Sequence, residues 1–138
     1  MGDEIKIITG MKHDGGRTKC TFPGHADLYA AGLGEIETHP DAWSPPHMLV
    51  ASTESCFYLT LLALAEKMRI EIESYSSTAE GLLTSTDGKH KEISEVVIRP
   101  VIKLKDESAK AKLPNLFKMA EEYCYVARSL KGKIRIEL

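Results

Sequence analysis

The amino-acid sequence predicts an α+β fold in which antiparallel sheets surround a long, buried central helix. Strand-like segments come in consecutive pairs, and each pair is followed by a helical segment, which is typical of α+β rather than of alternating parallel folds. The longest helical segment is apolar around most of its circumference, as a buried helix is. Because 138 residues are the usual length of one domain, we expect a single domain over residues 1–138.

A β-hairpin is predicted at the beginning of the chain. Residues 4–9 alternate between polar and apolar side chains around Ile5 and Ile7. Asp14-Gly15-Gly16 then forms a typical tight-turn sequence, because glycine adopts the positive φ angles that hairpin turns require. The second strand is expected to run from Arg17 to Phe22.

The central helix is predicted over residues 48–68, after the sequence Ser44-Pro45-Pro46. Serine caps free N–H groups at a helix start, and proline is tolerated in the first turn because its missing N–H is not needed there. The segment contains neither glycine nor proline. One small sheet cannot cover a helix that is apolar on nearly every side, so we expect a second copy of the chain to cover the rest.

The remainder of the chain is predicted to supply a second hairpin, a helix and a final strand. Proline cannot donate a hydrogen bond in a sheet, so Pro100 is expected at an edge or a bulge. The expected elements are strands at residues 70–83 and 92–105 joined by a turn at Asp87-Gly88, a helix at residues 109–123 divided at Pro114, and a strand at residues 133–138.

Composition argues against several classes of partner. The net charge is -2 and the basic residues form no run, so neither nucleic acid nor an anionic membrane surface is an expected partner. No signal-peptide pattern precedes the first strand, and three cysteines would leave one unpaired in a disulfide-stapled protein. We therefore expect a cytoplasmic protein. The histidines lack metal-ligand spacing and Gly15-Gly16 lacks a nucleotide-binding context, so no metal or cofactor is expected.

Cys56 and Cys124 are the candidate chemical groups. Cys56 lies inside the predicted central helix and Cys124 at the C-terminal end of the next predicted helix, and a cysteine in such a position is commonly an inert core residue. Reactivity requires the thiolate, and Cys56 is about three turns from the helix start, too far for the helix dipole to lower its pKa. A cation is therefore needed. Arg17 is the first candidate and Arg128 the second, whereas Cys20 is expected to be structural.

Three motifs resemble the OsmC/Ohr family, the osmotically inducible and organic hydroperoxide resistance proteins. The segment from Ser44 to Cys56 resembles the family's first cysteine motif, in which a Ser-Pro or Asn-Pro start leads to a cysteine at this interval. Residues 120–130, around Cys124, resemble the second cysteine motif. Gly15-Gly16-Arg17 is similar to the early hairpin of the family. The chain is thus identified as a divergent OsmC-like member.

The resemblance implies a thiol-dependent peroxidase that reduces organic hydroperoxides and forms an intertwined homodimer. Cys56 would attack the hydroperoxide and become a sulfenic acid, with which Cys124 would condense to a disulfide. An external dithiol would then reduce the disulfide. Arg17 would hold Cys56 as its thiolate.

The sequence departs from the family pattern at two positions. Pro46 stands where family peroxidases usually have a glutamate that braces the arginine, and Tyr125 replaces the proline that usually follows the second cysteine. Glu54 is a poor substitute because two helical residues turn the side chain by about 200° from Cys56. The candidate bracing residues are Asp14, Glu35 and Glu37.

These departures leave two alternatives to the enzyme. The first is a catalytically weak or inactive small-molecule-binding protein with the same fold. The second is a thiol-disulfide regulator that acts on other proteins. In the enzyme, Trp43, Phe57, Tyr58 and Phe117 are candidate walls of an apolar pocket for an alkyl hydroperoxide, although aromatic residues near a helix are more often core residues.

Overall fold

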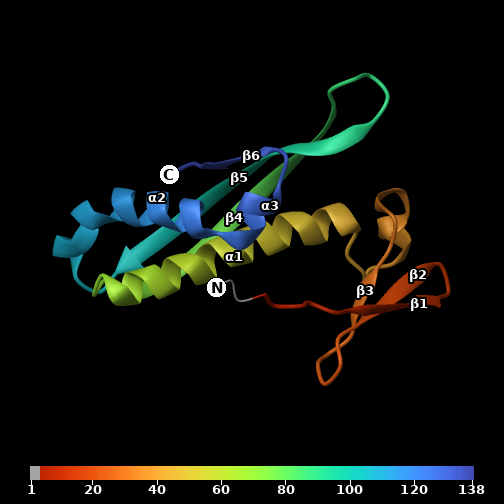
Figure 1. Ribbon diagram of the computed structural model, residues 1–138, viewed down its shortest axis with the longest axis horizontal. Helices are drawn as coiled ribbons and strands as arrows, with labels where there is room; N and C mark the ends of the chain where they lie inside the picture. The colour runs from red at the N-terminus through yellow and green to blue at the C-terminus, as the bar shows by residue number, and fades with distance from the viewer. Residues whose placement is uncertain (1–3) are drawn as a thin grey trace. The chain divides into compact units, whose positions relative to one another are not determined.

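The computed structural model describes residues 4–138, which divide into two compact units with the boundary between Met48 and Leu49 (Figure 1). Each unit is described by itself. In chain order the elements are β1 (Gly10–Asp14), β2 (Arg17–Thr21), β3 (Leu28–Ala30), the 3₁₀ helix η1 (Leu33–Thr38), α1 (Pro45–Lys67), β4 (Ile72–Ser85), β5 (Lys91–Leu104), the 3₁₀ helix η2 (Glu107–Lys112), α2 (Leu113–Tyr123), α3 (Tyr125–Ser129) and β6 (Lys133–Ile136).

The first unit contains a three-stranded antiparallel sheet in the order β1-β2-β3. The hairpin turn lies where the sequence predicts it, with positive φ angles of 57° at Gly15 and 86° at Gly16. The first strand, however, is β1 rather than residues 4–9. Asp14 pairs with Arg17 directly across the turn, so the partners of β2 are the residues immediately before that turn. The alternating pattern of residues 4–9 therefore misled the strand prediction.

The predicted helix start at Ser44 is confirmed. The Ser44 hydroxyl accepts a hydrogen bond from the His47 backbone N–H at 3.2 Å, which is the geometry of an N-cap. The same hydroxyl lies 2.6 Å from Nδ1 of His47, so this side chain is held at the helix start. Pro45 and Pro46 occupy the first turn, where no backbone donor is needed.

The second unit is built on a sheet in the order β4-β5-β6. The long β4–β5 hairpin is antiparallel, as predicted, whereas β6 runs parallel to β5, so this sheet is mixed rather than purely antiparallel. Pro100 pairs with Ser77 of β4 without a bulge, and β6 ends opposite Ile98. At Pro100 strand β5 is therefore locally an edge, which agrees with the expectation for proline.

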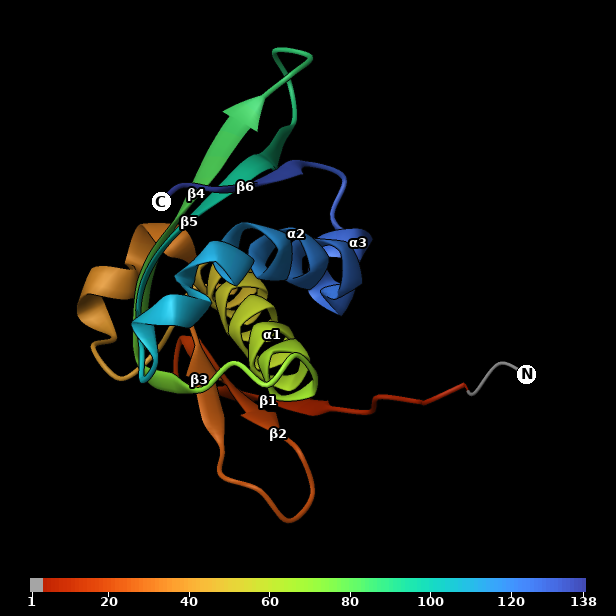
Figure 2. The same ribbon diagram turned by 90° about the vertical axis from the view of Figure 1, so that its left-hand side faces the viewer.

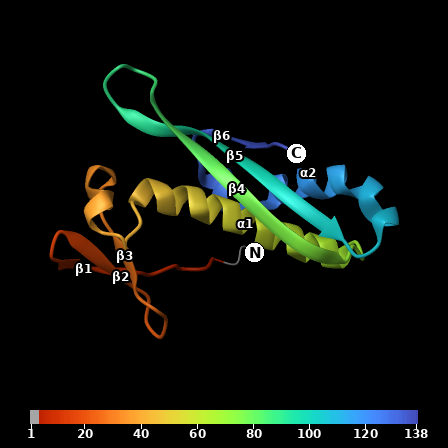
Figure 3. The same ribbon diagram turned by 180° about the vertical axis from the view of Figure 1, so that it is seen from behind.

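Helices α1 and α2 pack on one face of this sheet (Figures 2 and 3). The core between them contains stacked aromatic rings of Phe57 and Phe117, whose centroids are 6.3 Å apart. These two rings are therefore core residues. The other members of the core cluster are Leu61, Ala65, Ile70, Val96, Ile98, Leu104, Leu113, Leu116, Ala120 and Cys124. The predicted α+β class, with a long helix against antiparallel strands, is confirmed.

Strand β4 and helix α1 approach each other closely at Gly81. A Cβ atom at this position would overlap Cγ2 of Val50. Glycine is therefore required where the helix crosses the strand. This contact sets how closely α1 packs against β4.

One stripe of α1 is buried, comprising Thr53, Phe57, Leu61 and Ala65. Leu59 and Leu62, on other sides of the helix, are 60% and 40% exposed. Within a single chain, therefore, apolar residues on the other sides of α1 remain exposed to solvent. By length and composition α1 could also cross a membrane, with a mean hydropathy of 1.6 over its best window, but the core helix of a water-soluble protein meets the same criteria.

Candidate functional site

The second unit brings Cys56 and Cys124 together. Cys56 is a half-buried residue in the middle of α1, whereas Cys124 is fully buried at the boundary between α2 and α3. The Cys124 backbone has φ -70° and ψ 114°, which ends one helix and caps the next. The two thiols interact, and each contributes to the pKa of the other.

The environment of this pair shifts the two pKa values in opposite directions. Burial raises the pKa of Cys56, but hydrogen bonds from the Val126 N–H, the Cys124 thiol and the Tyr125 N–H outweigh burial, so the net shift is downward. Burial raises the pKa of the Cys124 thiol, and the neighbouring Cys56 raises it further. The arrangement therefore favours a thiolate at Cys56 and a protonated thiol at Cys124.

Cys56 lines a groove of about 790 Å³ in the second unit. Helix α1 forms one wall, and the end of α2 and the first residue of α3 form the other. The lining residues are Ser55, Cys56, Leu59, Thr60, Ala63, Leu64, Lys67, Met119, Tyr123 and Tyr125. The groove is mainly apolar and open on one side, so a hydrophobic molecule can reach the more acidic of the two thiols.

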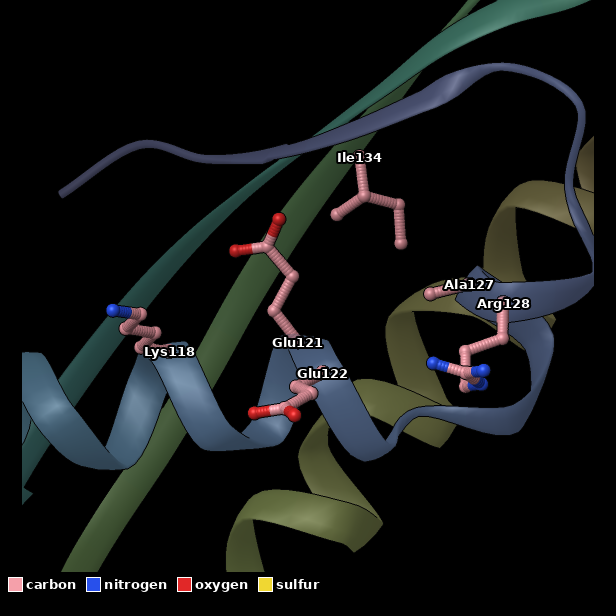
Figure 4. Close-up of a pocket in the computed structure, with 6 residues that line it drawn as sticks. All are labelled: Lys118, Glu121, Glu122, Ala127, Arg128 and Ile134. Atoms are coloured by element: carbon pink, nitrogen blue, oxygen red, sulfur yellow. The ribbon is translucent and has the colours of Figure 1, made fainter.

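A second hollow in this unit, of about 380 Å³, lies between α2, α3 and β6 (Figure 4). It is lined by Lys118, Glu121, Glu122, Ala127, Arg128 and Ile134. Charged side chains of both signs surround it, and it includes neither cysteine. Arg128, the second candidate cation, lies here rather than in the groove.

Arg17 lies in the first unit, where two carboxylates and one aromatic ring hold it. Its Nε and Nη2 atoms donate to Oδ2 of Asp14 at 3.2 and 3.1 Å, and its Nη1 atom donates to Asp41. The guanidinium carbon also lies 4.0 Å from the ring centroid of Tyr29. The Asp41 hydrogen bond raises the pKa of Arg17, and the same bond lowers the pKa of Asp41.

Arg17 also lines a hollow of about 450 Å³ within the first unit, together with Met11, His13, Thr18 and Pro45. Of the bracing residues proposed from the sequence, Asp14 contacts Arg17, whereas the ion pairs of residues 4–138 include neither Glu35 nor Glu37. The sequence analysis proposed Glu35 and Glu37 from this stretch of chain but missed Asp41, which contacts Arg17. Only the path of the loop before α1 brings it near.

Two further expectations concern residues outside the groove. Glu54 accepts a hydrogen bond from the Ser77 hydroxyl at 2.5 Å, so it faces β4, as the helix geometry predicts. Cys20, in β2, contacts the Thr18 hydroxyl at 3.9 Å. Within residues 4–138, no three His, Cys, Asp or Glu side chains gather as ligands of a metal ion would.

Sequence reasoning did not find the groove walls or the donors to Cys56. Met119, Tyr123 and Tyr125 line the groove instead of the predicted aromatic residues. The backbone N–H groups of Tyr125 and Val126 lower the pKa of Cys56, and backbone donors leave no mark in a sequence. Their only signal in the sequence was the resemblance of residues 120–130 to the second cysteine motif.

The protein is thus an α+β protein with one cysteine in its central helix and another at the boundary between two later helices. The model of the OsmC-like protein family matches residues 38–138, and the chain therefore belongs to the OsmC family. The uncharacterized protein YmaD of Bacillus subtilis is 26% identical over 107 residues, which are 75% of this chain and 71% of YmaD.

Solved structures share the fold. An OsmC-like protein of unknown function from Vibrio cholerae is 25% identical, with a TM-score of 0.77 over 88% of this chain and 83% of the other. The organic hydroperoxide resistance protein OsmC from Legionella pneumophila is 22% identical, with a TM-score of 0.71 over 98% and 97% of the two chains. At that identity the Legionella likeness concerns the fold alone.

Proposed function

We propose that this protein is a thiol-dependent peroxidase that reduces organic hydroperoxides through Cys56 and Cys124. The observation that carries the proposal is the asymmetry of the pair: the thiol with the lowered pKa lines an apolar groove, and its neighbour is buried and stays protonated. Membership of the OsmC family, and the fold shared with a hydroperoxide resistance protein, support this function.

In the proposed reaction the Cys56 thiolate attacks one peroxide oxygen. A sulfur–oxygen bond forms, the oxygen–oxygen bond breaks, and the alcohol leaves after taking up a proton. Cys124 then attacks the sulfenic acid, which forms a disulfide and releases water. An external dithiol returns two electrons and two protons, and both thiols are restored. The interaction between the two thiols, each of which shifts the pKa of the other, supports the second step.

Arg17 is proposed as the cation that assists Cys56. Asp14, Asp41 and Tyr29 hold its guanidinium from three directions, and a fixed guanidinium is suited to a thiolate or a peroxide oxygen. Asp14 and Asp41 would take the place of the family glutamate, whose position Pro46 occupies. We also propose a homodimer, since a second copy would cover the exposed apolar side of α1.

The test is treatment of the reduced protein with one equivalent of cumene hydroperoxide, followed by peptide mass spectrometry. We expect a disulfide between Cys56 and Cys124, and steady turnover when a dihydrolipoyl or thioredoxin-type dithiol is added. Cys56→Ser should abolish peroxide consumption. Cys124→Ser should consume one equivalent and leave a sulfenic acid at Cys56 that dimedone traps.

Cys20→Ser is the matched control and should behave as the wild type. Two free thiols at positions 56 and 124 after treatment would overturn the peroxidase. That result would favour the binding protein, to which the replacement of the family glutamate by Pro46 points. Exchange with protein disulfides without peroxide consumption would favour the regulator.

A further inference from the structure

The short helix α3 contributes to the environment of Cys56 but cannot hold its own position. The backbone N–H groups of Tyr125 and Val126, in its first turn, lower the pKa of Cys56. Helix α3 has five residues and no side-chain cap at its start, whereas an isolated helix needs about 12 to 15 residues to be stable in water. Its place beside Cys56 must therefore be set by the chain on either side of it and by packing.

Gly132 lies in the connection that leads from α3 to β6. A Cβ atom on Gly132 would lie 2.6 Å from the carbonyl oxygen of Ile93 and would overlap the carbonyl oxygen of Ser94. Both carbonyls belong to the backbone of β5, so neither can turn away as a side chain can. The next residue, Lys133, begins β6 opposite Glu95. Glycine is therefore needed for the chain to come this close to β5 before β6 starts.

Strand β6 fixes the chain after Gly132. All of its residues pair with β5, and Arg99 of β5 donates to the carboxylate of Glu137, which follows β6, at 2.9 Å. The chain before α3 is fixed as well, because Cys124 is fully buried. Helix α3 thus lies between two anchored points, Cys124 at its start and Gly132 three residues after its end.

We propose that Gly132 is a positioning residue for the thiol site, because its close contact with β5 holds the start of α3 against Cys56. The side chains of Val126, Ala127 and Leu130 also pack on the core, but side chains can change rotamer where two backbones in contact cannot. A methyl group at position 132 would have to move away by about 1 Å to reach an ordinary contact distance, and α3 would move with it. This inference rests on the proposed peroxidase function, in which Cys56 is the attacking thiol.

The test measures the acidity of Cys56 through its rate of alkylation by iodoacetamide across a pH series. We expect Gly132→Ala to raise the midpoint by about half a pH unit, which slows alkylation about threefold at pH 7. The other titratable side chains around Cys56 are those of Lys67, Tyr123, Cys124 and Tyr125. The substitution changes none of these side chains, so a shift in the midpoint reports a movement of the backbone.

Gly81→Ala is the matched control, because it makes the same substitution in the same unit but overlaps a side chain of α1 instead of the β5 backbone. It should lower the melting temperature without moving the midpoint, which separates positioning from a general loss of stability. A second variant inserts two glycines between Leu130 and Lys131. It keeps Gly132 in place but lets α3 move, because a longer connection costs little stability. It should raise the midpoint as Gly132→Ala does, and it provides the test where Gly132→Ala does not fold.

An unmoved midpoint in Gly132→Ala or in the insertion variant, or an equal shift in Gly81→Ala, would overturn the inference. Peroxide consumption separates this outcome from the proposed function. If the wild type does not consume cumene hydroperoxide while the midpoint shifts in Gly132→Ala, the peroxidase fails and the positioning role stands. If the peroxide is consumed and the midpoint does not move, the positioning role fails and the peroxidase stands.

Discussion

The interaction between the thiols of Cys56 and Cys124 lowers the pKa of Cys56 and raises the pKa of Cys124, so it stabilises the thiolate of one and the protonated form of the other. Two chemically identical side chains are thus made unequal by their surroundings. Two backbone N–H groups also lower the pKa of Cys56, while Cys124 is fully buried. The difference assigns the attacking role to Cys56 and the resolving role to Cys124 in the proposed reaction.

Removing the Cys124 donor is expected to raise the pKa of Cys56. In Cys124→Ala, less thiolate is present at pH 7, so iodoacetamide should alkylate Cys56 about two- to tenfold more slowly than in the wild type. Cys124→Ser keeps a hydroxyl donor and should retain most of the wild-type rate. Mass spectrometry of the Cys56 peptide across a pH series gives both the rate and the midpoint. Equal rates in the two variants would contradict the role of the donor.

The Arg17–Asp41 ion pair is expected to titrate only in acid. Asp41 has a pKa below the ordinary value of about 3.9 because Arg17 stabilises its carboxylate. A carboxyl with a depressed pKa stabilises the fold above the ordinary pKa and loses that contribution as the pH falls through the folded-state value. The pair should therefore be intact between about pH 5 and pH 8, a range that lies above both values.

NMR titration of the Asp41 carboxyl carbon measures this shift. Arg17→Ala should return the midpoint to about 3.9, and Arg128→Ala, which removes an arginine of the other unit, should leave it low. A midpoint that Arg17→Ala does not move would show that another group stabilises the Asp41 carboxylate.

A second copy of the chain is expected to cover the exposed side of α1. Sedimentation at micromolar concentration should give twice the 15.3 kDa mass of the chain. Leu62→Glu should yield a monomer, because burying a carboxylate in an apolar interface is costly. Val101→Glu changes a residue of β5 that is 70% exposed and should leave the dimer intact. A wild-type monomer would contradict this expectation.

The contact between Gly81 and Val50 should limit what position 81 tolerates. Gly81→Ala places a methyl group against Cγ2 of Val50, and overpacking of this kind lowers the free energy of unfolding by about 1 to 3 kcal/mol. In the background of Val50→Ala the same substitution should cost much less. Urea unfolding of the four proteins in this cycle measures the coupling, and additive effects would contradict the close contact.

Sequence periodicity predicted the helices and the long hairpin because glycine, proline and apolar spacing act locally. Examples are Ser44, which caps α1, and Pro114, which lies in the first turn of α2. The parallel direction of β6 was not predictable, since alternation does not encode which neighbour a strand joins or in which direction. Residues 4–9 show the same weakness: their pattern is strand-like, yet the turn register pairs β2 with Gly10–Asp14.

The candidate site was predictable only in part. The family motifs identified Cys56, Cys124 and Arg17, and the structure places the two cysteines together. The contact of Asp41 with Arg17 depends on the path of a loop, and the N–H donors of Tyr125 and Val126 depend on the angle between α2 and α3. Neither depends on side-chain type at a fixed spacing, so neither could be found by inspection of the sequence.

The position of Cys124 between two helices has a consequence for the oxidised protein. A bond from that boundary to the middle of α1 would close a covalent loop that contains both long strands of the second unit. Closing a loop of this length reduces the entropy of the unfolded chain by an amount worth about 4 kcal/mol near room temperature. The disulfide form should therefore melt at a higher temperature than the dithiol form, and thermal denaturation would report the redox state of the molecule.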